Sequence, residues 1–157
     1  MKKKLNIGFH ETMYGHYVNW ESKLKKFDFS VTATAPLERL NPNHSHAMLT
    51  DLKGAVTLEN LCHDEPMYNG FLLLDFFKQH KLIYEFEFDI GDKGHYFYSG
   101  SKDLSIKEPI TSMTTLKGVL KRSFNSRHIK DYATISKFKL EDVPRFLYSF
   151  LQQMKMK

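Results

Sequence analysis

One carboxylate and one amine stand among apolar residues, and both could take part in chemistry. On an extended chain Glu11 shares a face with Met13 and other apolar residues, because successive side chains of a strand point to opposite sides. Lys102 shares a face with Tyr96 and Tyr98. Burying an isolated charge is costly. Three interpretations stay open: a buried ion pair of Glu11 with Lys102, a ligand site, or a catalytic pair with Glu11 as base and Lys102 or a tyrosine as polariser.

Other patterns that could bind a metal or act as a nucleophile are weak. His44 and His46 lie two residues apart, but zinc sites need three or four ligands and the helical motif with paired histidines is absent. Cys62 precedes His63, and neighbours on an extended chain diverge, which disfavours a thiol–imidazole pair. No phosphate-binding glycine loop or dinucleotide fingerprint occurs. The sequence therefore predicts no metal site and no cofactor.

A hairpin is the clearest element that could position these groups. Residues 82–90 alternate apolar and acidic side chains without a break, which is typical of a strand with one dry face and one charged face. A short turn, GDKG at residues 91–94, leads into residues 95–102, which alternate again. Five aromatic side chains share the inward faces of this hairpin: Tyr84, Phe86, Phe88, Tyr96 and Tyr98.

Further strand patterns recur at short intervals along the chain. They cover residues 5–18, 27–35, 46–58, 67–77, 81–90, 95–102, 112–121 and 132–139. A bend is expected at Gly54 and a turn at residues 62–66. Both faces of residues 67–77 are apolar, so a helix or a second subunit is expected to cover the outer one.

Residues 140–155 differ in kind, because their apolar side chains recur at three- and four-residue steps. The sequence therefore predicts a mainly β, antiparallel, lipocalin-like barrel of roughly eight strands over residues 5–139, followed by a C-terminal amphipathic helix over residues 140–155. The alternative is a two-sheet β-sandwich with a packed helix. No repeat or linker divides residues 1–157, which are expected to form a single domain.

Charge and composition exclude several classes of protein. The net charge of +5 is polarised, with −6 over residues 59–92 and +6 over residues 117–139. Aromatic residues alternate with acids as often as with bases, which argues against nucleic-acid binding. No stretch is apolar enough for a transmembrane segment, and a single cysteine, Cys62, allows no internal disulfide. We expect a soluble, cytoplasmic protein, monomeric or homodimeric.

Five short motifs occur in an order that resembles a known bacterial domain. They are ETMYG at residues 11–15, GFLL at 70–73, IYEF at 83–86, YFYSGSK at 96–102 and MTTL at 113–116. This order resembles the β-barrel accessory domain joined to cholesterol-oxidase-like oxidoreductases of the glucose–methanol–choline type and to some α/β-hydrolases. The resemblance implies a lipid-associated context and a redox enzyme as partner.

The leading functional hypothesis is non-enzymatic binding of a small apolar or amphipathic molecule, lipid- or sterol-like, in a barrel cavity. The predicted ligand-binding residues are Glu11, Met13, Tyr84, Phe86, Phe88, Tyr96, Tyr98 and Lys102. The first alternative is a lipid-modifying isomerase- or cyclase-like enzyme that uses Glu11 and Lys102. The second is an accessory interaction module for a redox enzyme.

Overall fold

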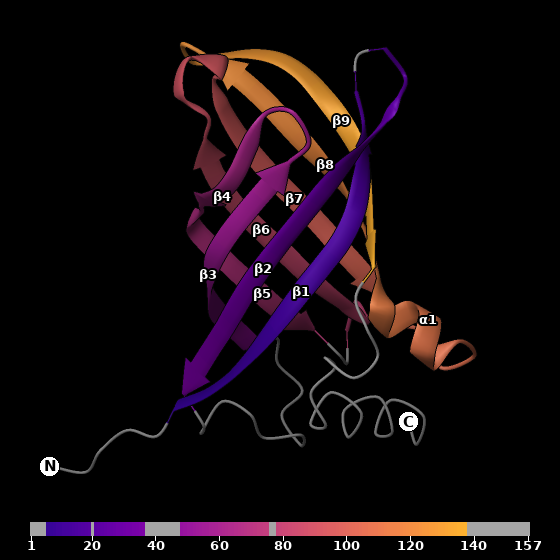
Figure 1. Ribbon diagram of the computed structural model, residues 1–157. Helices are drawn as coiled ribbons and strands as arrows, with labels where there is room; N and C mark the ends of the chain where they lie inside the picture. Colours follow the sequence, from indigo (N-terminus) through magenta and orange to yellow (C-terminus); the bar gives the residue numbers. More distant parts are fainter. Residues whose placement is uncertain (1–5, 20, 37–47, 76–77, 138–157) are drawn as a thin grey trace, which may run out of the picture.

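The computed structural model describes residues 6–19, 21–36, 48–75 and 78–137. Within them it contains nine strands, one short helix and one 3-10 turn (Figure 1). The strands are β1 (Asn6–Val18), β2 (Leu24–Pro36), β3 (Met48–Leu58), β4 (Cys62–Pro66), β5 (Tyr68–Asp75), β6 (Lys81–Asp89), β7 (His95–Asp103), β8 (Thr115–Phe124) and β9 (Arg127–Lys137). The 3-10 turn is η2 (Gly91–Lys93) and the helix is α1 (Pro109–Thr114).

The strands form one closed antiparallel barrel. Each barrel strand pairs with its neighbour along the chain, β1 also pairs with β9, and β2 pairs with β3. Strands β4 and β5 pair with successive parts of β3 and share one position, so eight positions complete the circle. The predicted eight-stranded barrel is confirmed, and the two-sheet sandwich is wrong because the sheet has no break between two layers.

Two local predictions need correction. Residues 62–66 were expected to be a turn, but they form β4, in which Pro66 pairs with Ala55 and Glu65 with Val56. Residues 112–114 were expected to begin a strand, but they end α1, whose first residue Pro109 suits a helix start. The expected C-terminal helix, residues 140–155, lies outside the described residues.

The predicted hairpin is confirmed as β6 and β7. Asp89 pairs with His95 beside the turn, and the register continues without a shift to Lys81 and Asp103. The turn is closed by hydrogen bonds between the Ile90 amide and the Gly94 carbonyl and between the Lys93 amide and the Ile90 carbonyl. Alternate residues of both strands are buried, so strict alternation in the sequence identified the inner face correctly.

Aromatic rings from non-neighbouring strands meet in the middle of the barrel. We call Phe27 and Phe29 of β2, Phe86 of β6 and Tyr98 of β7 the ring cluster. Ring centroids of Phe29 and Phe86 lie 5.2 Å apart, those of Phe86 and Tyr98 4.9 Å, and those of Phe27 and Tyr98 5.3 Å. Such contacts add to the gain from apolar burial. The ring cluster therefore ties opposite walls of the barrel together.

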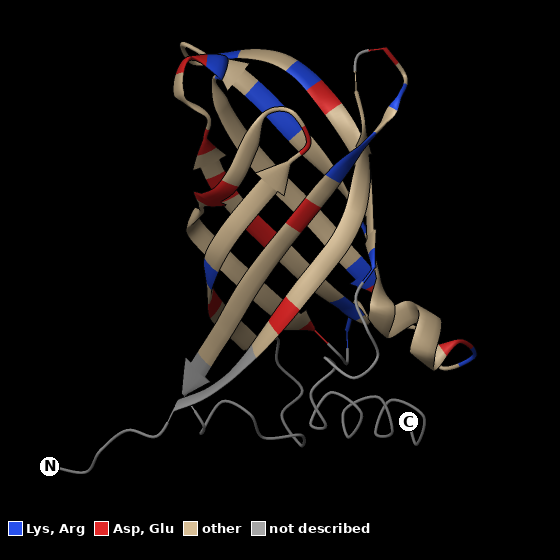
Figure 2. Cartoon of the chain, in the orientation of Figure 1, with Lys and Arg blue, Asp and Glu red and all other residues tan. Residues whose placement is uncertain are grey.

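The two ends of the barrel differ. The turns after β1, β3, β6 and β8 form what we call the upper end, and α1 lies toward the lower end (Figure 1). Charged residues are unevenly spread around the wall: lysine and arginine positions recur along β8 and β9, where Asp131 is the acidic exception (Figure 2). The basic part of the charge polarity expected from the sequence therefore lies on two paired strands, β8 and β9.

At Gly54 strand β3 approaches β2 too closely for a side chain at this position. It pairs with Val31 of β2, and a Cβ atom at position 54 would overlap the carbonyl oxygen of Ser30. We expect Gly54→Ala to lower the free energy of unfolding by about 3 kcal/mol, because β2 and β3 must separate. Gly91→Ala is the control: nothing lies within 4 Å of its Cβ position, so its loss comes only from the left-handed φ of +41° and should be about 1–2 kcal/mol. Chemical unfolding measures both, and equal losses would contradict the close packing.

Candidate functional site

Glu11, Tyr84 and Lys102 meet inside the barrel from three strands, β1, β6 and β7. The Tyr84 hydroxyl donates a hydrogen bond of 2.7 Å to Glu11 Oε2, and Lys102 Nζ lies 3.5 Å from Glu11 Oε1. Lys102 Nζ also lies 4.9 Å from the centroid of the Tyr84 ring. The Glu11 and Lys102 side chains are fully buried. Both residues lie on the interior face, and their contact is the ion pair that was one of the three interpretations of the sequence.

Burial governs the acid–base properties of this cluster. It lowers the pKa of Lys102 to about 8, although the Glu11 carboxylate acts in the opposite direction. It also raises the pKa of the Tyr84 hydroxyl well above its ordinary value, and the neighbouring Glu11 charge adds to that rise. Lys102 and Glu11 form an ion pair, and the Tyr84 hydroxyl donates to the second carboxylate oxygen. Such an arrangement can hold a charge pair stably in an apolar interior.

The other predicted ligand-binding residues also face inward. Met13, Phe86, Phe88, Tyr96 and Tyr98 are at most 1 % exposed. Phe86 and Tyr98 belong to the ring cluster, while the rings of Phe88 and Tyr96 stack 5.2 Å apart with an angle of 8° between their planes. These side chains fill the bore by contacting one another.

A cavity of about 280 Å³ opens at the upper end. Its apolar wall comes from Leu58 and Leu120 and from three tyrosines, Tyr17, Tyr96 and Tyr132. The rings of Tyr17 and Tyr132 meet edge to face at 5.8 Å. Since Tyr96 stacks on Phe88, the inner end of the cavity rests on the packed bore. Tyr96, a predicted ligand-binding residue, thus lines a cavity that the sequence did not reveal.

Arg122 supplies a positive charge to this cavity. It follows Leu120 on the inward face of β8, its Nε donates a 2.8 Å hydrogen bond to the Lys93 carbonyl, and its guanidinium carbon lies 5.9 Å from the Tyr96 ring centroid. Two carboxylates, Glu21 and Glu59, and a second cation, Lys25, also line the cavity. The two carboxylates already form ion pairs with Lys23 at 3.3 Å and Lys25 at 3.7 Å. Among the described residues, Arg122 has no carboxylate partner of its own.

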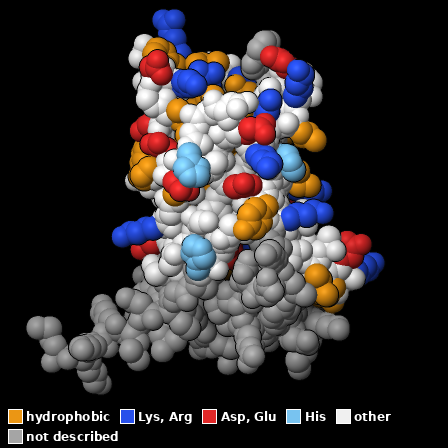
Figure 3. All heavy atoms as spheres, viewed as in Figure 1, with side chains coloured by type: hydrophobic (Ala, Val, Ile, Leu, Met, Phe, Trp, Pro, Cys, Tyr) orange, Lys and Arg blue, Asp and Glu red, His pale blue; other side chains and the backbone are white. Residues whose placement is uncertain are grey.

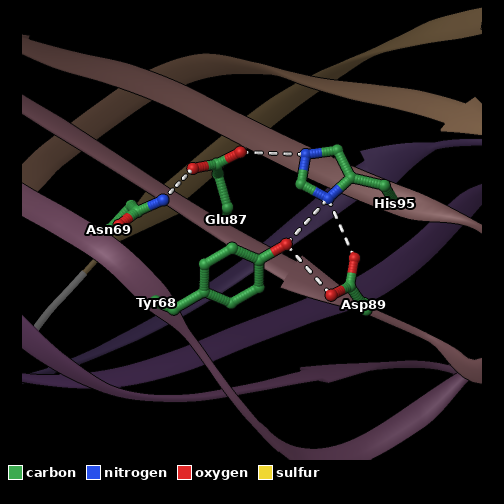
Figure 4. Close-up of polar contacts among 5 residues, drawn as sticks. All are labelled: Tyr68, Asn69, Glu87, Asp89 and His95. Atoms are coloured by element: carbon green, nitrogen blue, oxygen red, sulfur yellow. Dashed lines mark hydrogen bonds and ion pairs between the residues drawn. The ribbon is translucent and has the colours of Figure 1, made fainter. Parts of the chain in front are cut away.

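A second polar cluster lies on the outer wall, where β5, β6 and β7 meet (Figure 4). His95 Nδ1 lies 2.9 Å from Asp89 Oδ1, and His95 Nε2 lies 3.0 Å from Glu87 Oε1. The Tyr68 hydroxyl donates to Asp89 Oδ2 at 3.0 Å, and Asn69 Nδ2 donates to Glu87 Oε2 at 2.8 Å. The cluster fastens the irregular start of β5 to the β6–β7 hairpin.

The electrostatics of the outer cluster favour a structural role. Desolvation and the hydrogen bond to Asp89 raise the pKa of Tyr68 to about 12, so its hydroxyl is a poor base or nucleophile. The hydrogen bond with His95 lowers the pKa of Asp89. The sequence assigned Glu87 and Asp89 to a solvated acidic face. The pairing of Asp89 with His95 across the predicted turn was the signal that could have revealed their partner.

The described residues contain no group of histidine, cysteine and acidic side chains that could hold a metal ion. His44 and His46 lie outside them. The helical residues that the structure describes include no segment of the length and hydropathy needed to cross a membrane.

The fold defines the class of this chain as a closed eight-stranded antiparallel β-barrel with a packed bore and a cavity at one end. Comparisons with protein-family models, with curated proteins and with solved structures find no match to it. Sequence reasoning found Glu11, Lys102 and the inward aromatics, but it missed Tyr17, Tyr132 and Arg122. Side-chain alternation places these three residues on inward strand faces, but it does not show that they meet around one cavity.

The contact of Glu11 with Lys102 generates a double-mutant test. Glu11→Gln should lower the free energy of unfolding by about 3–5 kcal/mol, because it leaves the buried Lys102 charge uncompensated. Lys102→Met should lower it by less, because burial already disfavours the lysine charge. The double variant should lose less than the sum of the two single losses. Chemical unfolding of all four proteins at neutral pH provides the comparison. Small, additive losses would show that the two charges do not depend on each other.

The lowered pKa of Lys102 predicts a pH dependence. Between its folded pKa of about 8 and its ordinary value of 10.5, the unfolded chain binds more protons at this residue, so its contribution to stability rises with pH. The free energy of unfolding of the native chain relative to Lys102→Met should increase by about 2–3 kcal/mol from pH 7 to pH 10. Urea unfolding at several pH values measures it. A flat or falling difference would contradict the assigned protonation behaviour.

Proposed function

We propose that this barrel binds a small amphipathic acid, non-enzymatically, in the cavity at its upper end. The observation that carries the proposal is a cavity whose wall combines tyrosine and leucine side chains with one arginine that has no carboxylate partner among the described residues. Ligand sites of barrels often lie in their mouths, where apolar walls hold the body of the ligand and a few polar groups orient it.

The apolar body would pack against Tyr17, Tyr96 and Tyr132. Tyrosine rings offer large, rigid contact areas, and the stacking of Tyr96 on Phe88 gives the body a firm base. A volume of about 280 Å³ lies near the lower bound for small-molecule sites. It suits a short chain or one ring system. A longer lipid- or sterol-like molecule would insert only one end.

The acidic group would lie beside Arg122. A guanidinium has five N–H donors, and the bond to the Lys93 carbonyl uses the Nε donor. The terminal nitrogens can donate charge-assisted hydrogen bonds to a carboxylate, sulfonate or phosphate. Because Glu21 and Glu59 have lysine partners, the charge of Arg122 favours an anion over a neutral or cationic ligand.

The two alternatives stay predictions. Glu11 and Lys102 could serve a lipid-modifying enzyme as base and polariser only if a substrate reached them, and their full burial supports a stabilising role instead. The accessory role beside a redox enzyme rests on the motif resemblance. Neither alternative uses the charge of Arg122, which has no carboxylate partner among the described residues, whereas binding of an amphipathic acid does.

Octanoate and octan-1-ol separate the roles of the acid and the apolar body. We expect octanoate to bind more tightly, and Arg122→Gln to weaken octanoate at least tenfold, because a hydrogen bond to a charged group contributes about 1.5–3 kcal/mol. Octan-1-ol affinity should change less than twofold. Titration followed by backbone amide NMR measures both constants and locates the site.

Lys121→Gln is the matched control, since Lys121 is the sequence neighbour of Arg122 but is exposed on the outer face of β8. It should leave both affinities unchanged. The proposed site would be contradicted if both substitutions weakened octanoate binding equally. It would also be contradicted if the chemical-shift changes on titration were confined to residues away from the upper end.

A further inference from the structure

Apolar side chains are exposed at the tips of two hairpins of the upper end. Leu24 is 66 % exposed and Val18 36 %, on either side of the β1–β2 turn. Ile129 is 49 % exposed and Phe124 43 %, on either side of the β8–β9 turn. A space-filling view shows hydrophobic and basic side chains along this end, with acidic side chains between some of them (Figure 3).

Exposed cations accompany these apolar tips. Lys93, Arg127 and Lys130 are exposed and form no ion pair with a carboxylate among the described residues. Most acidic groups of the same end are engaged: Glu21 with Lys23, Glu59 with Lys25, and Asp131 with His128 at 2.7 Å. We call the four apolar tips and these three cations the upper rim. Asp92 is also exposed beside Lys93, so the surface of the upper end is apolar with a small excess of positive charge.

The cavity lies between the two hairpins of the rim. Asn19 and Glu21 line it beside the β1–β2 turn, and Arg122 and Tyr132 line it from β8 and β9. Any surface that contacts both sets of tips therefore faces the mouth of the cavity.

We propose that the upper rim docks on an anionic lipid bilayer, from which the cavity takes up its ligand. The inference rests on the proposed function, because an amphipathic acid partitions into bilayers with its charged end at the interface. Spread apolar tips with interspersed lysine and arginine suit a fluid, negatively charged interface. A rigid protein partner would instead match one contiguous packed patch.

Co-sedimentation with vesicles tests the docking. Vesicles of equal parts phosphatidylcholine and phosphatidylglycerol should bind the protein, and binding should weaken as salt is raised. Vesicles of phosphatidylcholine alone should bind at least tenfold less. The variant with Leu24→Ser and Phe124→Ser, and separately the variant with Arg127→Glu and Lys130→Glu, should each lower the partition coefficient about tenfold or more.

Two matched controls lie away from the rim. Ile110→Ser removes an apolar side chain that is 55 % exposed on α1, near the lower end. Lys117→Glu reverses an exposed charge on the wall of β8. Both should bind anionic vesicles within twofold of the native chain. Octanoate titration of every variant without vesicles tests the cavity independently of docking.

The outcomes separate the two proposals. Loss of vesicle binding in the rim variants, with octanoate affinity retained, supports docking. Equal binding to neutral and anionic vesicles, or equal loss in the control variants, overturns it. Binding to soluble polyglutamate but not to vesicles also overturns it and assigns the rim to an acidic protein. A native chain that binds anionic vesicles through the rim but no octanoate would support docking while refuting the proposed cavity ligand.

Discussion

The narrow bore of an eight-stranded barrel is the constraint on which the rest of this structure depends. Closing the sheet through the pairings of β1 with β9 and β2 with β3 leaves an interior about wide enough for side chains to fill. Every inward residue must therefore fit partners on the opposite wall. The ring cluster meets this demand with aromatic contacts between β2, β6 and β7, and space for a ligand among the described residues remains where the strands end.

The same constraint explains how a charge is tolerated inside. Glu11 lies across the bore from Tyr84, and Lys102 reaches the same carboxylate from β7. Because water is excluded, each charge depends on the other, and burial shifts the pKa of Lys102 downward as far as Glu11 allows. A buried pair of this kind adds little net stability relative to apolar side chains of similar volume, whereas loss of one partner alone is costly. The contacts of the ion pair therefore lie within the packed bore, and the side chains suited to binding a ligand lie at the upper end of the barrel.

The proposed binding site lies at the upper end, where the turns are free of the packing demands of the bore. Arg122 lies on the inward face of β8, near enough to the upper end to line the cavity. The exposed tips Leu24 and Phe124 extend beyond it. One end therefore combines an apolar cavity, an uncompensated cation and a positive, partly apolar rim, and these features suit the uptake of an amphipathic acid from an anionic surface.

The sequence by itself determined the strand class, the β6–β7 hairpin and the inward faces, because side-chain alternation and turn residues are local properties. It also placed Glu11 and Lys102 inside, since a charge among apolar neighbours of one strand face needs a partner. Only the tertiary structure decided that their common neighbour is Tyr84, that His95 bridges Glu87 and Asp89, and that Tyr17, Tyr132 and Arg122 surround one cavity. Most of these contacts join strands distant in sequence, and barrel closure with its register determines which residues meet, a geometry that no single strand pattern contains.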